Sequence, residues 1–247
     1  MLQPVQSASL ADKVFAQLLG EIVKGTYSAG DKLPAERKLS EVFEVNRHVV
    51  REALKRLEQV GLIRISQGGS TEVRDFRQSG GLDVLGLMAG HALAADKALG
   101  YWRSILEMRA AIAADTARLC AQRASPALKA EISALTAQMQ NTQDDQALFA
   151  LEVRYWDTVL AGADNLAYRL AFNSMMKSLR ALPSAVQAWS LREIRQTQCH
   201  QVLSDAIARG DADAAEQDTR TLMRQGLKTF AHFSASLMPT NTPQAQA

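Results

Sequence analysis

Basic and amide side chains are concentrated in the segment Asn46–Arg56, where their spacing suits contact with a nucleic acid. Four residues in this segment are basic and only Glu52 is acidic. Arg47 and Arg51 lie one helical turn apart, so both can face the same groove of a duplex. An arginine that donates two hydrogen bonds to a guanine contributes about 1–3 kcal/mol of discrimination between bases. The residues placed to reach bases or phosphates from the start of this helix are Asn46, Arg47, His48 and Arg51.

The same basic segment also fits an ordinary solvated helix face, and the charge pattern alone leaves both interpretations open. The whole chain has 247 residues and a formal net charge of only +2, so its overall charge does not indicate a nucleic-acid partner. The placement of the charge says more than its total, because the positive excess is concentrated in this one segment.

A helix that presents basic side chains to a groove needs an apolar face that holds it on a core. Val50, Leu54 and Leu57 recur at helical spacing and form such a face, and the basic residues fall largely off it. Asn46 suits the N-cap of this helix, because its side chain can accept a hydrogen bond from the first turn. Gly61 suits the left-handed residue that commonly ends a helix.

A preceding helix and a following hairpin are expected around this element. Pro34 suits the first position of the preceding helix, where its missing N–H is not needed. Two β-prone runs, 62–66 and 70–74, flank Gln67-Gly68-Gly69, and a glycine-containing link between such runs favours a hairpin. Together with the amphipathic segment Leu10–Lys24, this order predicts a winged helix-turn-helix.

Beyond Gly80-Gly81 the chain loses its strand signals and continues in long segments of helical periodicity. Hydrophobic residues make up 47% of the sequence and aromatic residues 6%, which suits a helical protein rich in alanine and leucine. The predicted fold class is mainly α, with an N-terminal winged helix-turn-helix (three helices and a β-hairpin) joined to an all-α antiparallel helical bundle. The predicted domains are a DNA-binding domain at 1–78, a helical effector-binding and dimerisation domain at 79–237, and a disordered tail at 238–247.

The sequence carries no motif of enzymatic catalysis that we can identify. It lacks GxSxG, a phosphate-binding GKS/T loop and HExxH, and its four histidines are scattered singly. No apolar run approaches the roughly 20 residues of a membrane span, and the N-terminus has no basic segment followed by an apolar one. Cys120 and Cys199 lie far apart and are expected to be reduced, buried thiols. We therefore expect a cytoplasmic protein that is not an enzyme and has no membrane partner.

The helix-turn-helix region carries a signature of residues at fixed positions. These are Leu33-Pro34-Ala35-Glu36-Arg37, Leu39-Ser40, Arg47, Val50-Arg51-Glu52-Ala53-Leu54, Leu57 and Gly61-Leu62-Ile63. The signature resembles that of the GntR family of bacterial transcription regulators over residues 10–75. The resemblance implies a homodimer that binds a palindromic operator in double-stranded DNA. It also implies that Arg37 contacts the major groove and that Gln67 and Gly68 lie at the wing tip over the minor groove.

Four features of the C-terminal part carry a second, looser resemblance. They are Glu107-Met108-Arg109, Ala117-Arg118-Leu119, Asn165 and His200–Asp211. They resemble the helical FCD effector domain of the FadR branch, which implies a small metabolite that alters operator affinity. Many such domains hold a metal on an Asp and a His one helical turn apart plus two later histidines. The positions here are Glu152, Trp156, His200 and Leu222, so two ligands are lost, and we expect no metal and no other cofactor.

The residues expected to line an effector site are Arg109, Glu152, Trp156 and His200. A guanidinium offers a planar two-point fork for a carboxylate, and the indole of Trp156 suits stacking on a ligand or closing off its site. The expected effector is a small organic acid or an acyl-CoA. Two alternatives stay open: Arg109 instead pairs with Glu152 or Glu107, and His200 is a core histidine bonded to a backbone carbonyl.

Two functions are consistent with these residues. The first is a ligand-responsive DNA-binding transcription regulator, whose affinity for a duplex falls steeply with salt because bound counterions are released. The alternative is a helical protein-interaction module without sequence-specific DNA binding, whose association would depend little on salt.

Overall fold

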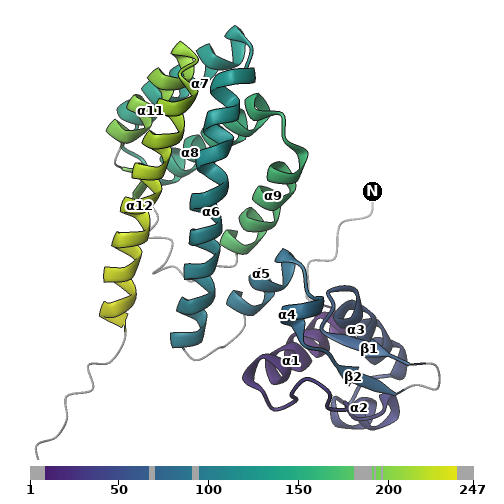
Figure 1. Ribbon diagram of the computed structural model, residues 1–247. Coiled ribbons are helices and arrows are strands. Elements are labelled where there is room, and N and C mark those ends of the chain that lie inside the picture. The colour runs from purple at the N-terminus through teal and green to yellow at the C-terminus, as the bar shows by residue number, and fades with distance from the viewer. Residues whose placement is uncertain are drawn as a thin grey trace, which may run out of the picture. The chain divides into compact units, whose positions relative to one another are not determined.

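The computed structural model describes residues 9–66, 70–90, 95–180, 191, 193–195 and 197–237. The chain divides into two compact units, and each is described here by itself (Figure 1). The N-terminal unit comprises residues 1–94 with 177–181, and the helical unit comprises 95–176 with 182–247.

Some expectations fall on residues that the structure does not describe. Gln67 and Gly68 of the expected wing tip and the tail 238–247 lie outside the described residues. The domain boundary expected after residue 78 stays a prediction.

Three helices form the helix-turn-helix part of the N-terminal unit: α1 (Leu10–Lys24), α2 (Glu36–Val42) and α3 (Arg47–Gln59). Ser9 caps α1, because its Oγ accepts a hydrogen bond from the backbone N of Asp12 at 3.1 Å. The carboxylate of Asp12 accepts the backbone N–H of Ser9 in return at 2.8 Å. This reciprocal pair satisfies two N–H groups that the first turn cannot satisfy internally.

The start of α2 differs from the expectation that Pro34 opens this helix. The helix begins at Glu36 with Ala35 as its N-cap, so Pro34 lies before it. The preceding residues are held in extended form by the hairpin, because the backbone N of Leu33 donates to the carbonyl of Thr71 at 2.9 Å. After α2, Glu44 adopts a left-handed conformation with φ 52°, which turns the chain sharply into α3.

The apolar face expected on α3 is confirmed. Val50, Ala53, Leu54 and Leu57 are each no more than 1% exposed, and α3 packs against α1. Full burial of a valine or leucine side chain contributes about 1.5–3 kcal/mol, so this row holds α3 firmly on the core. The opposite face of α3 is left for solvent or a partner.

The expected hairpin is confirmed with shorter strands. β1 (Ile63–Ile65) pairs antiparallel with β2 (Thr71–Val73), and Lys32 forms an isolated bridge with Glu72. Two further helices in this unit, α4 (Phe76–Ser79) and α5 (Leu82–Gly90), follow the hairpin. No helix was expected at α4, whereas α5 lies in the part of the chain that was expected to be helical.

The described part of the helical unit is all α-helix. α6 packs against α8 and α12, while α7 lies against α8 and α11. Figure 1 shows α6 and α12 as long antiparallel neighbours. The fold class predicted from the sequence is therefore confirmed. The helices are α6 (Ala95–Arg123), α7 (Pro126–Asn141), α8 (Asp145–Ala163), α9 (Leu166–Arg180), α11 (Thr197–Arg209) and α12 (Ala212–Leu237).

Local signals explain where several of these helices begin. Ser125 caps α7 through a hydrogen bond from the backbone N of Leu128 at 3.3 Å, with Pro126 at its first position. Asp144 caps α8 in the same way through the backbone N of Ala147 at 2.7 Å. None of the described helices combines the length and apolar character needed to cross a membrane.

Both cysteines are free thiols, as expected. Cys120 is buried in the helical core, and this burial raises the pKa of its thiol to about 12. Cys199 is half-buried rather than buried, which corrects the expectation for that residue.

Gly61 follows α3 and lies against the end of α4, in a conformation and a space that suit glycine alone. Its φ of +80° is left-handed, and an added Cβ would lie 2.4 Å from the carbonyl oxygen of Ser79. We predict that Gly61→Ala lowers the free energy of unfolding by about 2 kcal/mol or more, because strain and overlap with backbone add together. Urea denaturation of the full chain measures this change.

The matched control for this prediction is Gly20→Ala within α1. Nothing lies within 4 Å of the Cβ that it would gain, so the change should stabilise the helix by up to about 1 kcal/mol. Equal stability changes for the two variants would contradict the role given to Gly61.

Candidate functional site

The face of α3 that points away from the core is polar and exposed. Arg47, His48, Arg51 and Lys55 are exposed, and they lie on the same helix as the buried apolar row. Arg47 is the first residue of α3, so its side chain stands at the N-terminal end of the helix. The arrangement offers positive charge and hydrogen-bond donors to a polyanion.

Asn46 already has a structural role at the start of α3. Its Oδ1 accepts a hydrogen bond from the backbone N of Val49 at 3.0 Å, so the expected N-cap is confirmed. The side-chain oxygen of Asn46 is therefore already in a hydrogen bond. Its side-chain NH2 group remains available to a base or a phosphate.

Arg51 is held by a carboxylate from α2. Its Nη2 donates to Oε2 of Glu36 at 2.7 Å and its Nε donates to Oε1 at 3.2 Å. The hydrogen bonds from Arg51 lower the pKa of Glu36, so the carboxylate is ionised at neutral pH. Arg37 pairs with Glu41 on its own helix at 3.2 Å and is largely exposed. Sequence reasoning did not anticipate that Glu36 would orient Arg51.

Arg56 is half-buried and contacts α1, so it is not part of the exposed basic face. Its Nη1 lies 2.5 Å from Oδ1 of Asp12, and its guanidinium lies 4.6 Å from the centroid of the Phe15 ring. Both partners are on α1. One of the four basic residues in the segment 46–56 thus docks α3 on α1, through charge and a cation–π contact.

The wing is described only at its base. The backbone N of Ser66 donates to the carbonyl of Ser70 at 2.9 Å, which brings the two strands together next to the undescribed tip. Glu58 of α3 accepts a hydrogen bond from the backbone N of Ile65 at 2.7 Å, so the hairpin is tied to α3. DNA contacts by the residues named from the sequence stay predictions.

In the helical unit the structure brings together all four residues expected to line an effector site. Arg109 comes from α6, Glu152 and Trp156 come from α8, and His200 comes from α11. Oε2 of Glu152 lies 2.8 Å from Nε2 of His200, and Oε1 accepts a hydrogen bond from the indole nitrogen of Trp156 at 2.8 Å. Nη2 of Arg109 lies 3.9 Å from Oε1 of Glu152.

Sequence reasoning missed a fifth member of this buried cluster, Glu193. Its two carboxylate oxygens lie 3.2 and 3.3 Å from Nη1 of Arg109, and the residue is only 5% exposed. It precedes α11 in the short charged run Leu191–Arg195. An arginine away from water needs a carboxylate partner, but this rule does not say where in the sequence that partner lies.

The two alternatives left open by the sequence are resolved in part. Arg109 pairs within the chain with Glu193 and Glu152, whereas Glu107 pairs with Arg103 at 2.8 Å. Of the two partners that the sequence left open for Arg109, Glu152 is the one that lies beside its guanidinium. His200 is 1% exposed and is a core histidine, with the carboxylate of Glu152 beside it.

Burial and charge act against each other in this cluster. Burial disfavours the charged form of Arg109, but the carboxylates of Glu193 and Glu152 outweigh it and leave the pKa of Arg109 raised. Burial likewise disfavours ionised Glu152, but His200, Arg109 and Trp156 leave its pKa lowered. The cluster thus holds one guanidinium and two carboxylates, and a proton on His200 would bring its charge to zero.

The side chains at the four corresponding positions do not fit the metal that many FCD domains hold. Glu152 and His200 are the two ligand-type side chains at the four corresponding positions. The indole N–H of Trp156 donates a hydrogen bond and has no lone pair to offer a metal, and Leu222 is a buried apolar residue. Among the described residues, no group of three or more His, Cys, Asp or Glu side chains is placed to hold an ion.

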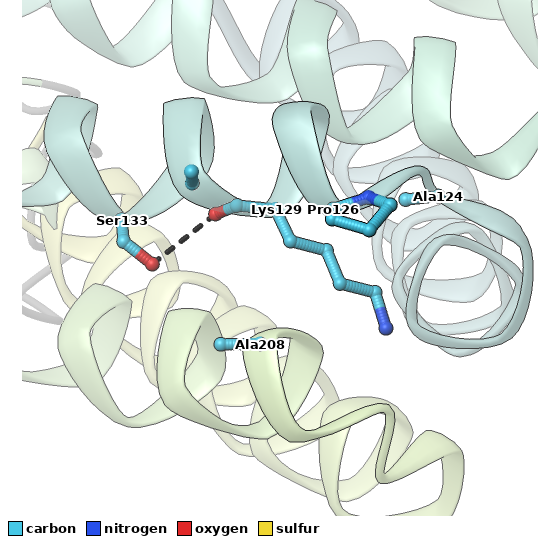
Figure 2. A pocket seen from close by; sticks show the side chains of 6 residues that line it. Ala124, Pro126, Lys129, Ser133 and Ala208 are labelled. Atoms are coloured by element: carbon cyan, nitrogen blue, oxygen red, sulfur yellow. Dashed lines mark hydrogen bonds between the residues drawn. The ribbon is translucent and has the colours of Figure 1, made fainter.

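A shallow depression of about 400 Å³ lies elsewhere on the helical unit, between α7 and α11 (Figure 2). Lys129 is the charged residue in its lining, and its Nζ donates to the carbonyl of Ala121 at 2.9 Å. This ammonium satisfies the C-terminal end of α6, which is an ordinary structural role for a lysine. The remaining lining residues are Ala124, Pro126, Ala130, Ser133 and Ala208.

The buried cluster generates a prediction about stability. Arg109→Met removes the cation and leaves two buried carboxylates without it, so we expect the free energy of unfolding to fall by about 3–5 kcal/mol. Arg103→Met, on the same helix, removes a guanidinium that is 74% exposed and should cost about 1 kcal/mol or less. Urea denaturation of both variants measures the difference, and comparable losses would show that Arg109 is not a structural counter-ion.

Comparison with known proteins gives a consistent answer for both units. Residues 10–73 match the family model for bacterial regulatory proteins of the gntR family, and residues 104–225 match that of the FCD domain. The solved structure of Lar, described as controlling expression of the Listeria monocytogenes agr system, covers 92% of this chain and 99% of its own. Its TM-score is 0.58 at 14% identity, which indicates a shared fold.

Two curated relatives extend over nearly the whole chain. The galactonate operon transcriptional repressor of Escherichia coli is 30% identical over 225 residues, covering 90% of this chain and 97% of its own length. The HTH-type transcriptional regulator Mce2R of Mycobacterium tuberculosis is 33% identical over 223 residues, covering 90% and 92%. The chain therefore belongs to the GntR family, with an FCD domain after its DNA-binding module, and is a transcription regulator rather than an enzyme.

Proposed function

We propose that this regulator binds a palindromic operator as a homodimer through α3, and that a small organic acid in the helical unit alters operator affinity. The observation that carries the DNA proposal is the division of α3 into two faces. Val50 and Leu54 fix the helix on the core, while Arg47 and Arg51 stand exposed. A helix anchored in this way can enter a major groove without losing its own packing.

Each residue proposed at the interface has a distinct chemical role. Arg47 and Arg51 would donate to guanine edges, because a guanidinium matches the two acceptors of guanine. His48 and the amide of Asn46 would contact bases or phosphates at the N-terminal end of α3. Arg37 of α2 would contact the backbone of the DNA. Gln67 and Gly68 would approach the minor groove.

Glu36 supports the proposed role of Arg51. A long flexible side chain loses rotamer freedom when it is fixed against a base, and that loss weakens binding. The two hydrogen bonds from Arg51 to Glu36 fix the guanidinium in advance. The proposal is that the remaining N–H groups of Arg51 face the operator while this pair stays formed.

The homodimer follows from the small size of one recognition helix. A single helix-turn-helix reads only a few base pairs, whereas two copies related by a two-fold axis read both halves of a palindrome. The half-sites would then lie one turn of duplex apart, or a multiple of it.

The DNA proposal is tested with duplex from upstream of the regulator's own gene. We predict that Arg47→Ala or Arg51→Ala weakens specific binding by at least about tenfold, as expected when a base contact worth 1–3 kcal/mol is lost. The protein should stay folded, because both side chains are exposed. Fluorescence anisotropy at fixed salt measures the affinity.

Lys24→Ala provides the control for charge alone. Lys24 is an exposed lysine of the same unit that pairs with Glu21 at 3.5 Å on α1. Its removal should leave specific binding nearly unchanged. If the wild type binds a scrambled duplex as well as its own upstream region, the operator proposal is wrong.

The buried cluster supports a small organic acid as the effector. Arg109 offers hydrogen-bond donors to a carboxylate, and Glu152 and His200 lie beside it as partners for hydroxyl groups. A cluster of buried charges suits a compact polar ligand better than the long apolar chain of an acyl-CoA. The relative named for a galactonate operon gives a precedent, since galactonate is a hydroxylated carboxylate.

A thermal-shift screen tests the effector proposal. Organic acids, sugar acids and acyl-CoAs are compared, and a cognate ligand at about 100 times its Kd should stabilise the fold by about 2.7 kcal/mol. We predict that the stabilising compound is a small hydroxylated or simple carboxylate and that Arg109→Met abolishes its effect. Stabilisation by acyl-CoA alone, or a shift that persists in Arg109→Met, would contradict this assignment.

A further inference from the structure

The carboxylate of Glu193 occupies the donor face of Arg109. Both of its oxygens lie within 3.3 Å of Nη1, and its side chain is only 6% exposed. Glu152, the other carboxylate near this guanidinium, lies farther away at 3.9 Å and is also engaged by Trp156 and His200. Of the two carboxylates, Glu193 is thus the one committed to Arg109.

A glycine in α12 provides the space that this carboxylate fills. An added Cβ at Gly226 would lie 2.3 Å from Oε1 and 2.7 Å from Cδ of Glu193, closer than any real contact. Gly226 lies inside the long helix Ala212–Leu237, where a glycine destabilises the helix relative to alanine. The backbone of α12 and the guanidinium of Arg109 therefore enclose the same carboxylate from two elements.

The charge balance limits how a ligand can bind to Arg109. A ligand carboxylate added to the cluster as it stands would place a third negative charge beside one guanidinium in a buried environment. Burying an uncompensated charge is strongly unfavourable. Exchange of one carboxylate for another leaves the charge of the cluster unchanged, and it gives the incoming group the same donors.

We propose that Glu193 is an internal carboxylate that occupies the effector position on Arg109, and that a carboxylate effector binds by displacing it. This inference rests on the proposed function, in which Arg109 holds the effector. Glu193 then determines the ligand class, because a neutral sugar or a cation cannot replace its interaction with the guanidinium. It also reduces the affinity for every carboxylate by competing for the same donors.

Exchange also links the ligand to helix packing. In the ligand-free protein Glu193 connects the residues before α11 to both α6 and α12. When a soluble carboxylate takes its place, the ion pair of Glu193 with α6 and its packing against α12 are lost while the charge balance is kept. A ligand that changes contacts in this way can shift a conformational equilibrium, since its affinity differs between the two states.

Chemical rescue with acetate and formate tests the exchange without requiring the natural effector. Glu193→Ala empties the space of the carboxylate and leaves Arg109 without it. Acetate or formate should then raise the melting temperature of this full-length variant by several degrees relative to chloride at equal ionic strength. The wild type should respond little, because its own carboxylate competes.

Three further variants keep the test decisive. Glu193→Gln preserves the shape and weakens the competitor, so acetate should stabilise it more than the wild type and less than Glu193→Ala. If Glu193→Ala does not fold, the comparison of Glu193→Gln with the wild type decides. Glu107→Ala removes an exposed carboxylate and should respond as the wild type does. The double variant Arg109→Met/Glu193→Ala should show no rescue.

An equal response to acetate in all these variants would overturn the proposal. The outcome is separable from the proposed function. Loss of operator binding would not affect the rescue, which involves no DNA. A failed rescue, combined with an Arg109-dependent effector shift, would remove Glu193 as the occupant and leave the effector site in place.

Discussion

The burial of one face of α3 against α1 is the constraint on which the DNA-binding unit depends. Val50, Leu54 and Leu57 leave the helix no freedom to rotate about its axis, because rotation would expose them. Arg56 fixes the same helix through Asp12 and Phe15 of α1. The direction of every other side chain on α3 follows from this packing. The basic face therefore needs no stabilisation of its own.

The helical unit is organised around a different kind of interaction. In its cluster Glu152, Glu193 and His200 are buried and Arg109 is half-buried, so each charge there is stable only beside a partner of opposite sign or a hydrogen-bond donor. Replacement by apolar side chains of similar volume would pack at least as well. Such a cluster is weak evidence for stability, and in the effector proposal its role is therefore to recognise a ligand.

The sequence predicted those parts of the structure that depend on local order. The apolar row of α3 and the cap at Asn46 are confirmed, because helical periodicity and capping act within a few residues. The start of α2 was placed too early at Pro34, because the hairpin holds the preceding residues extended. Glu193 could not be found, because its partner Arg109 lies 84 residues away. Pairings across such distances are set by the assembled helices.

The FCD resemblance places Trp156 where many such domains have a metal-binding imidazole, and an indole there changes what this cluster can recognise. A metal site collects lone pairs, so its carboxylate and imidazoles direct lone pairs inward to a cation. Here the indole N–H of Trp156 and the guanidinium of Arg109 direct protons towards Glu152 instead. A position lined by donors binds ligands that bring lone pairs and negative charge, without an intervening ion. In this structure the group with lone pairs and negative charge comes from the chain itself, because the carboxylate of Glu193 pairs with Arg109.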